Sequence, residues 1–137
     1  MIKGIYGINI AVRDLEQATQ NYEKAFGVKS EPVGPTGFAF PGLSGSRFNL
    51  NGFCLNLITS QDETTSVGRF LKQKGEGFFL LSVETNEIEA DLDVLRGKGF
   101  TPLLAASANG AFGAVNFLHP KQLNGVQLEI YEPATAC

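Results

Sequence analysis

The chain has 137 residues, of which 43% are hydrophobic and 18% charged, and its formal net charge is −3. This length and apolar content suffice for one domain with a buried core. The acidic balance argues against nucleic acid as a partner, and no apolar run approaches the roughly 18 residues that span a membrane. The first residues lack the charged and apolar regions of a signal peptide, so we expect a cytoplasmic protein.

The expected elements form the same series twice. Residues 5–12 alternate as a strand, and residues 15–26 carry apolar side chains at helical spacing between an Asp14 cap and Gly27. Short β-type runs follow at 38–40 and 53–58, and a connecting helix is expected within 63–74. The second series has a strand at 78–84, a helix capped by Asn86 and ending before Gly99, and β-type runs at 114–118 and 126–131.

An internal repeat relates the two series. The dipeptides Asn51-Gly52 and Asn124-Gly125 are hairpin-turn signals and stand 73 positions apart (124 − 51). The same shift places Ile10 on Val83. We therefore expect one domain over 1–137, with a first βαβββ module at about 1–60, a linker helix at about 63–74 and a second βαβββ module at about 75–133.

Strand alternation sorts the side chains into two layers. The uniformly apolar layer is assigned to packing beneath the helices: Ile8, Ile10, Val12, Phe53, Leu55, Leu57, Phe79, Leu81, Val83, Val126, Leu128 and Ile130. The opposite layer mixes amides, carboxylates, a phenol and apolar groups: Gly7, Asn9, Ala11, Cys54, Asn56, Ile58, Phe78, Leu80, Ser82, Glu84, Gln127, Glu129 and Tyr131. This second composition is typical of a ligand cavity and equally of a half-solvated sheet face.

Two stretches, INIAVRDLEQA at 8–18 and YEKAFG at 22–27, resemble the opening of the vicinal-oxygen-chelate superfamily of glyoxalases, bleomycin-resistance proteins and dioxygenases. Further segments look most like its methylmalonyl-CoA epimerase branch: SVGRFL at 66–71, GEG at 75–77, FLHP at 117–120 and NGVQLE at 124–129. The resemblance implies an α+β fold whose two βαβββ modules form paired U-shaped mixed sheets. It does not specify the reaction, because this fold hosts several chemistries.

The resemblance also implies four positions for a divalent metal, and most have lost their ligands. The usual histidines fall on Gly7 and Leu80, the usual glutamine or glutamate falls on Asn56, and the closing glutamate is kept as Glu129. One carboxylate and one short amide are too few for a tight site. We therefore expect no resident cofactor. Oxygens for a weakly held magnesium or calcium ion could come from Asn9, Glu84 and Gln127.

Other chemically active residues are assigned ordinary roles. His119, the only histidine, lies in a turn-like Leu-His-Pro context and is expected to be structural or on the surface. Cys54 and Cys137 show neither metal spacing nor a disulfide framework, and Cys54 is interpreted as a small buried side chain. Four basic residues are expected as solvated surface, with a nucleotide phosphate as the alternative partner: Arg47, Arg69, Lys72 and Lys74.

Three functions stay open. The first is a metal-free protein that binds a small, partly apolar molecule between the modules, through Asn9, Asn56, Phe78, Leu80, Gln127, Glu129 and Tyr131. The second is a divergent isomerase or lyase, of the epimerase or glyoxalase type, in which Glu129 performs acid–base chemistry. A cleft filled by its own phenylalanines would favour the third, a structural or interaction module. The resemblance further implies a homodimer.

Overall fold

The computed structural model describes residues 1–137 and contains two βαβββ halves joined by a helix. The first half comprises β1 (Gly4–Ala11), α1 (Leu15–Phe26), β2 (Glu31–Val33), β3 (Ser44–Leu50) and β4 (Phe53–Thr59). Helix α2 (Ser66–Lys74) follows. The second half comprises β5 (Gly77–Glu84), α3 (Ile88–Gly97), β6 (Ala108–Gly110), β7 (Gly113–Leu118) and β8 (Leu128–Pro133). Two short 3-10 helices lie at Pro35–Gly37 and Pro120–Gln122.

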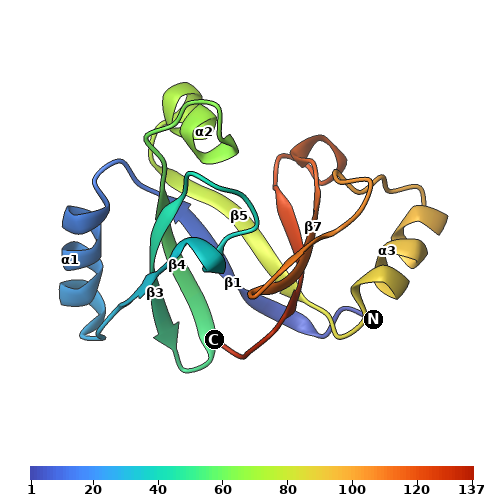
Figure 1. Ribbon diagram of the computed structural model, residues 1–137, viewed down its shortest axis with the longest axis horizontal. Coiled ribbons are helices and arrows are strands. Elements are labelled where there is room, and N and C mark those ends of the chain that lie inside the picture. The colour runs from blue at the N-terminus through green and yellow to red at the C-terminus, as the bar shows by residue number, and fades with distance from the viewer.

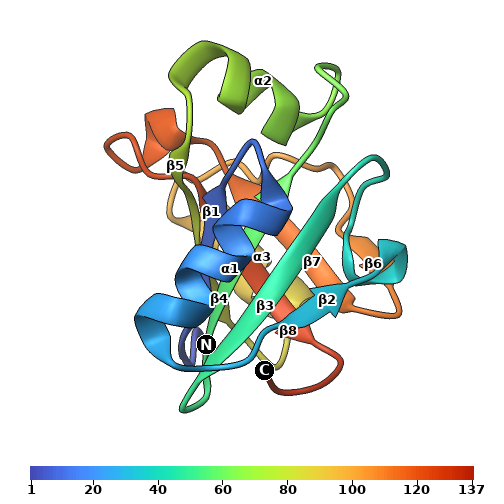
Figure 2. The same cartoon turned by 90° about the vertical axis from the view of Figure 1, so that its left-hand side faces the viewer.

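All eight strands belong to one curled sheet in the order β2-β3-β4-β1-β5-β8-β7-β6. The first strands of the two halves, β1 and β5, pair antiparallel at its centre, and each pairs in parallel with the last strand of its own half. Helices α1 and α3 lie on opposite sides of the molecule, and α2 covers the end between them (Figure 1). The side view in Figure 2 shows α1 against the β3–β4 arm of the sheet. The mixed α+β fold with two βαβββ units is confirmed.

The 73-residue repeat holds best at the start of each half. Strand β1 shifted by 73 residues coincides with β5 at both ends, and the first residue of α1 shifts onto the first residue of α3. The later strands drift out of this register because the two halves have loops of different length. Strands β2 and β6, each of three residues, and the longer β3 were not expected, whereas the β-type run at 38–40 forms no strand.

Helix α1 ends where its local sequence signals predict. The backbone N–H of Gln17 donates to Asp14 Oδ1 (3.0 Å), and Gly27 closes the helix at φ 64°. The Gln17 side chain donates to Asn21 instead of returning to the cap, so only half of the expected capping box is present.

The expected Asn86 cap on α3 is wrong. The residue preceding the helix is Glu87, whose side chain makes no capping bond. The N–H of Ile88 donates instead to Glu132 Oε1 in β8 (2.9 Å). A carboxylate distant in sequence therefore satisfies this helix end.

Both Asn-Gly dipeptides adopt the expected turn conformation. Asn51 and Asn124 have φ 56°, and the glycines that follow have φ 92°. The first turn joins β3 directly to β4. The second lies inside a longer connection between β7 and β8, so Val126 precedes the strand and is exposed, which corrects its assignment to the core.

Three apolar clusters hold the fold together. Val12, Leu55 and Leu57 pack under α1, and Leu118 and Ile130 pack against Leu92 of α3. The third cluster lies on the inner face, beneath α2: Ala11, Ile58, Val67, Leu71, Phe79, Leu80, Val115 and Phe117. The helix-facing layers therefore agree with strand alternation, apart from Val126 and the start of β5.

Candidate functional site

The four positions singled out in the sequence lie on the inner face of four adjacent strands, β4, β1, β5 and β8. Gly7 stands between Cys54 on one side and Ser82 on the other. Ser82 in turn pairs with Glu129, and its hydroxyl donates to Glu129 Oε1 (2.8 Å). Asn9 follows two residues after Gly7 in β1, on the same face and one level of the sheet nearer α2, and its cross-strand partners are Asn56 and Leu80. The strand register thus brings residues 7, 56, 80 and 129 to one interior.

A ladder of polar side chains crosses the first half. Asn56 Nδ2 donates to Asn9 Oδ1 (3.0 Å), and Asn56 Oδ1 accepts from Arg47 Nε (3.2 Å). Arg47 reaches this ladder because it pairs with Asn56 across the β3–β4 hairpin. The expectation that Arg47 belongs with the solvated basic residues is wrong, since its side chain is half-buried on the inner face.

Glu129 is an unusual carboxyl group for a protein interior. Burial raises the pKa of Glu129 to about 7, although the hydrogen bond from Ser82 acts in the opposite direction and lowers it. The side chain nevertheless keeps some solvent exposure, because it faces the space between the modules. A carboxyl group with this pKa exchanges a proton near neutral pH, so it can donate or accept a hydrogen bond there.

Two tyrosines stand beside Glu129. The rings of Tyr6 and Tyr131 meet edge to face at 4.9 Å, and the Tyr131 hydroxyl donates to the Phe112 carbonyl (2.7 Å). Burial raises the pKa of both phenols, that of Tyr131 to about 12. The Glu129 charge raises both pKa values further and the Arg47 charge lowers them, so charges from both halves act on the same phenols.

A β-bulge in the pairing of β1 with β5 displaces two predicted residues. Asn9 pairs with Leu80, but Ile10 pairs with Phe78, which leaves Phe79 between them. Phe78 therefore shares the outer face with Ile10 and is 49% exposed, so its assignment to the ligand site is wrong. Phe79 lies in the inner cluster against Phe70 of α2 (5.1 Å between ring centroids), not beneath α1 or α3.

A second bulge turns toward the inner face a residue that strand alternation did not assign to it. Ile5 pairs with Val83 and Gly7 with Ser82, so Tyr6 has no cross-strand partner. It is 5% exposed and turns toward Tyr131. Strict alternation places Tyr6 on the helix side, and no local signal in the sequence marks the bulge.

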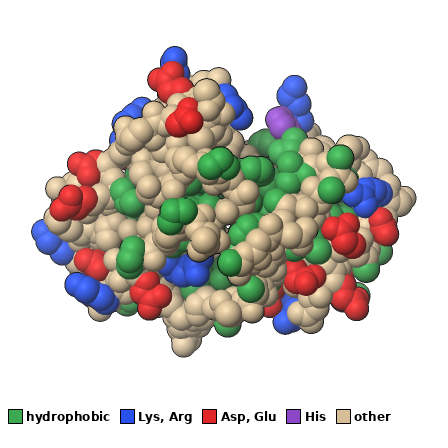
Figure 3. Space-filling model, viewed as in Figure 1, with side chains coloured by type: hydrophobic (Ala, Val, Ile, Leu, Met, Phe, Trp, Pro, Cys, Tyr) green, Lys and Arg blue, Asp and Glu red, His purple; other side chains and the backbone are tan.

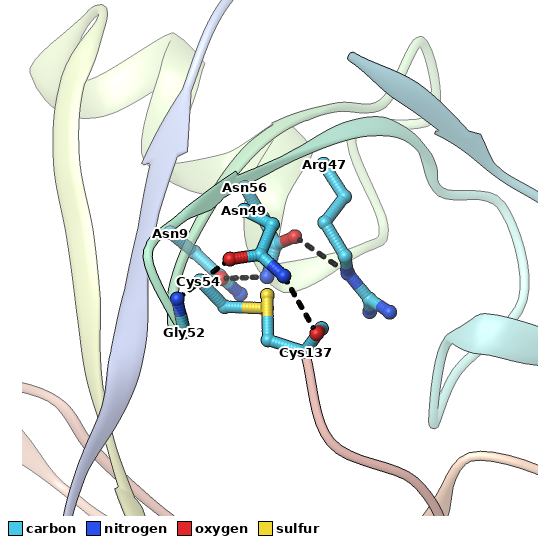
Figure 4. The surroundings of a disulfide bond; sticks show 7 residues. All are labelled: Asn9, Arg47, Asn49, Gly52, Cys54, Asn56 and Cys137. Carbon is cyan, nitrogen blue, oxygen red and sulfur yellow. Dashed lines mark hydrogen bonds between the residues drawn. A yellow bond between two sulfur atoms is a disulfide. The ribbon is translucent and has the colours of Figure 1, made fainter. Parts of the chain in front are cut away.

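The two cysteines form a disulfide, which corrects the expectation of no disulfide. Cys54 and Cys137 have Cα atoms 5.6 Å apart and are separated by 83 positions in the sequence. The bond ties the segment after β8 to β4, next to the Asn9–Asn56 amide pair (Figure 4). Asn49 Nδ2 donates to the Cys137 carbonyl (2.8 Å) and adds a second contact. The 134–137 segment therefore bridges the two arms of the sheet.

The inner face divides into an apolar part and a polar part. Beneath α2 it is filled by protein, including side chains of the 38–43 segment, and Phe40 lies against Phe117 at 6.1 Å. Apolar side chains gather along the seam between the halves in Figure 3. The polar part holds Glu129, Tyr131 and the asparagine ladder, all half-buried. Two cavities, of about 320 and 370 Å³, lie elsewhere and touch none of these residues.

The match to known families decides the classification. The family model described as the glyoxalase, bleomycin resistance protein and dioxygenase superfamily matches residues 7–118, most of the chain. The protein belongs to this superfamily. A search of curated protein sequences gave no match.

Among solved structures, methylmalonyl-CoA epimerases of this superfamily are similar to the chain. The Mycobacterium tuberculosis enzyme is 26% identical, with a TM-score of 0.85 over 98% of this chain and 90% of that one. The Streptomyces coelicolor enzyme, in complex with 2-nitronate-propionyl-CoA, is 27% identical, with a TM-score of 0.83 over 98% and 100%. A hypothetical protein from Bacillus halodurans, 21% identical with a TM-score of 0.83, shares the fold.

The residues at the superfamily's metal positions do not fit a metal. A Cβ atom on Gly7 would collide with the backbone carbonyl of Cys54, so no side chain enters there without moving a strand. Leu80 is an apolar side chain, and the oxygen of Asn56 already accepts from Arg47. No three histidine, cysteine, aspartate or glutamate side chains gather anywhere in the structure. Glu129 therefore has no group of neighbouring side chains with which it could bind a metal ion.

The remaining candidates lie outside this polar part. Gln127 precedes β8, and its carbonyl accepts from the Leu81 N–H (3.0 Å). His119 is exposed, and its Nδ1 accepts from the Lys121 N–H (3.0 Å) as a cap on the second 3-10 helix. Glu84 forms an ion pair with Lys3 at the far end of β5.

The basic side chains of α2 are exposed and engaged locally: Arg69 with Thr64, Lys72 with Glu63 and Lys74 over Phe70.

Proposed function

We propose that the protein binds a small, partly apolar molecule in the polar part of the inner face, without a metal. The observation that carries this proposal is Glu129, a half-buried carboxyl group whose only protein partner is Ser82 and whose pKa is about 7. Such a group is costly to bury for stability alone, because its desolvation is offset by a single hydrogen bond. A polar ligand group would complete its hydrogen bonding.

The surroundings of Glu129 support a ligand of limited size. Asn9 and Asn56 lie on the α2 side of Glu129 and Tyr131 on its other side, whereas the part beneath α2 is closed by packed phenylalanines. This filling is the feature expected of a purely structural module. It leaves Glu129 half-buried with a single hydrogen bond, and this favours binding over a structural role.

Thermal-shift screening tests the binding proposal. The panel contains short-chain acyl-CoAs, aromatic metabolites and antibiotics, and a binder is expected to raise the melting temperature of the wild type and not of Glu129→Gln. Glu63→Gln serves as the matched control, since Glu63 is exposed and lies outside the inner face. No shift with any compound would contradict the proposal.

A second function, acid–base isomerisation through Glu129, is favoured by the same pKa and by the similarity to epimerases. In this case Glu129 would move a proton to or from a carbon next to a thioester or ketone carbonyl. The test is solvent-deuterium incorporation into methylmalonyl-CoA, together with turnover of hemithioacetals, by wild type and Glu129→Gln whose metal content is measured. Deuterium incorporation by the wild type and not by Glu129→Gln would support enzymatic isomerisation. No incorporation by either protein would rule out this second function.

We further propose a homodimer that pairs through the outer face of the central strands. Ile5 in β1 and Phe78 in β5 are 58% and 49% exposed on this face. A two-fold pairing would cover both side chains with the same surface of a second copy. Light scattering during size-exclusion chromatography measures the mass, and a monomer at high micromolar concentration would contradict the dimer.

The cellular location also stays a proposal. None of the helices has the length and apolarity needed to cross a membrane. We propose a cytoplasmic protein, although the Cys54–Cys137 bond is of a kind more common in oxidising compartments. Alkylation of free thiols in cells, before lysis, tests the location: labelled cysteines are expected in a reducing compartment and unlabelled ones in an oxidising one.

A further inference from the structure

Arg47 is the only lysine or arginine in any of the eight strands, and it points into the interior. Its Nε donates to Asn56 Oδ1, and the Asn56–Asn9 bond holds that oxygen in place. Figure 4 shows the far end of the guanidinium group beyond this bond, and the bond from Nε is the hydrogen bond that the Arg47 side chain makes. The asparagine ladder therefore fixes the orientation of Arg47 and leaves its two terminal nitrogens free.

No protein carboxylate neutralises Arg47. The ion pairs of the structure join Met1 to Asp91, Lys3 to Glu84, Lys72 to Glu63 and Arg96 to Asp93. Glu31 is next to Arg47 in strand register but forms no ion pair with it. A half-buried guanidinium without an anion is unfavourable, and its planar pair of donors matches the two oxygens of a carboxylate.

The charged groups around Arg47 limit the net charge that a ligand bound to it can carry. The Arg47 charge acts on the phenols of Tyr6 and Tyr131, and so does the charge of Glu129. Arg47 is therefore the one positive charge acting on these phenols, and it is opposed by the carboxyl groups of Glu129 and, beside Tyr6, Glu84. A dianion such as a phosphate monoester would meet repulsion from Glu129 with only one cation to balance it, whereas a monoanion would be neutralised.

Buried apolar side chains of β7 stand behind the same interior. Val115 stands opposite Tyr131 and Phe117 stands opposite Glu129 in the pairing of β7 with β8. Both belong to the inner apolar cluster, and Phe40 lies against Phe117. We infer that Arg47 anchors a monoanionic organic carboxylate whose apolar part lies against Tyr131. This inference rests on the proposed binding function and specifies its ligand class.

The test compares carboxylates with uncharged analogues of the same shape. Benzoate, phenylacetate and 3-phenylpropionate are titrated by NMR against the matching primary amides and against phenyl phosphate. At least one carboxylate of the series is expected to bind about tenfold more tightly than its amide. Chemical shifts at Gly7, Asn9 and Ser82 report whether a probe occupies the inner face.

Variants at Arg47 separate the anion anchor from general packing. Arg47→Gln keeps a donor for Asn56 and is expected to bind the acid and the amide equally, whereas Arg47→Lys keeps the charge and retains part of the preference. Arg69→Gln, on the exposed face of α2, is the control and is expected to match the wild type. Melting curves of every variant verify the fold.

The outcomes distinguish the two proposals. Amides that bind the inner face as tightly as the acids, or an acid preference that survives in Arg47→Gln, would overturn the carboxylate inference and leave the binding function standing. Tighter binding of phenyl phosphate would also overturn it. No binding of any probe at the inner face would count against both.

Discussion

At the scale of single residues, Gly7 stands where the resemblance places a histidine ligand, and its surroundings leave no space for a side chain. Strand β1 approaches β4 so closely that a Cβ atom on Gly7 would overlap the Cys54 carbonyl. A side chain at this position therefore requires more than a substitution, because the Cys54 backbone occupies the place that its Cβ atom would take. Restoring a histidine at this position would require β1 and β4 to separate.

This geometry makes Gly7→Ala a destabilising substitution. We expect a loss of about 1–3 kcal/mol in the free energy of unfolding, since overlap with backbone is relieved only by moving a strand. Gly4→Ala in the same strand is the control, because no atom lies within 4 Å of its added Cβ. Urea denaturation measures both variants, and equal midpoints would refute the close approach.

The carboxyl group of Glu129 makes stability depend on pH. Its pKa of about 7 in the folded protein exceeds the ordinary value of 4.5, so the folded state binds the proton more tightly than the unfolded state. Stability is then full below about pH 4.5 and falls as pH rises toward 7, by up to about 3 kcal/mol from this group alone. Above pH 7 the contribution is constant.

Glu129→Gln is expected to remove that pH dependence, because glutamine carries no charge and can still accept the Ser82 hydrogen bond. The variant should be more stable than the wild type at pH 8 and similar to it at pH 4.5. Thermal unfolding between pH 4.5 and 8.5 provides the comparison. Parallel stability profiles for the two proteins would show that Glu129 ionises normally.

At the scale of elements, the segment after β8 acts as a tie between the two arms of the sheet. The Cys54–Cys137 bond closes a loop of 83 sequence positions, and a loop this long restricts the unfolded chain considerably. The Asn49 contact to the Cys137 carbonyl supports the same arrangement. Residues 134–137 thereby end beside the Asn9–Asn56 pair, at the polar part of the inner face.

Cys137→Ser is expected to lose about 2–4 kcal/mol of stability relative to the oxidised wild type. Reductant should lower the melting temperature of the wild type to that of the variant and leave the variant unchanged. Differential scanning calorimetry with and without dithiothreitol measures the difference. If reductant left the melting temperature of the wild type unchanged, the disulfide would be absent or would not contribute to stability.

Element prediction succeeded where signals are local and failed where they are not. The Asp14 cap, the Gly27 stop and both Asn-Gly turns depend on neighbours within four residues, and all are present. The cap of α3 comes from Glu132, which no local pattern marks. The bulge that places Phe78 outside arises from pairing between β1 and β5, which the alternation rule takes to be regular.

At the scale of the whole molecule, the two halves meet through β1 and β5 and leave an apolar outer face at the centre of the sheet. Ile5→Glu places a charge in the proposed dimer contact without touching the inner face. We expect this variant to elute with the mass of a monomer while its melting temperature stays within a few degrees of the wild type's at low concentration. Lys98→Gln, which makes the same one-unit change in net charge in the exposed segment after α3, is the control and should stay dimeric.

The sequence by itself determined the repeat, the α+β fold, most of the helix-facing core and the side of the sheet on which Asn9, Asn56 and Glu129 lie. Periodicity and turn chemistry carry that information because they act between near neighbours in the chain. Only the tertiary structure decided that Arg47 and Tyr6 share this interior, that Phe78 does not, and that the two cysteines join. These depend on bulges and on pairings between residues far apart in sequence, whose register no single strand encodes.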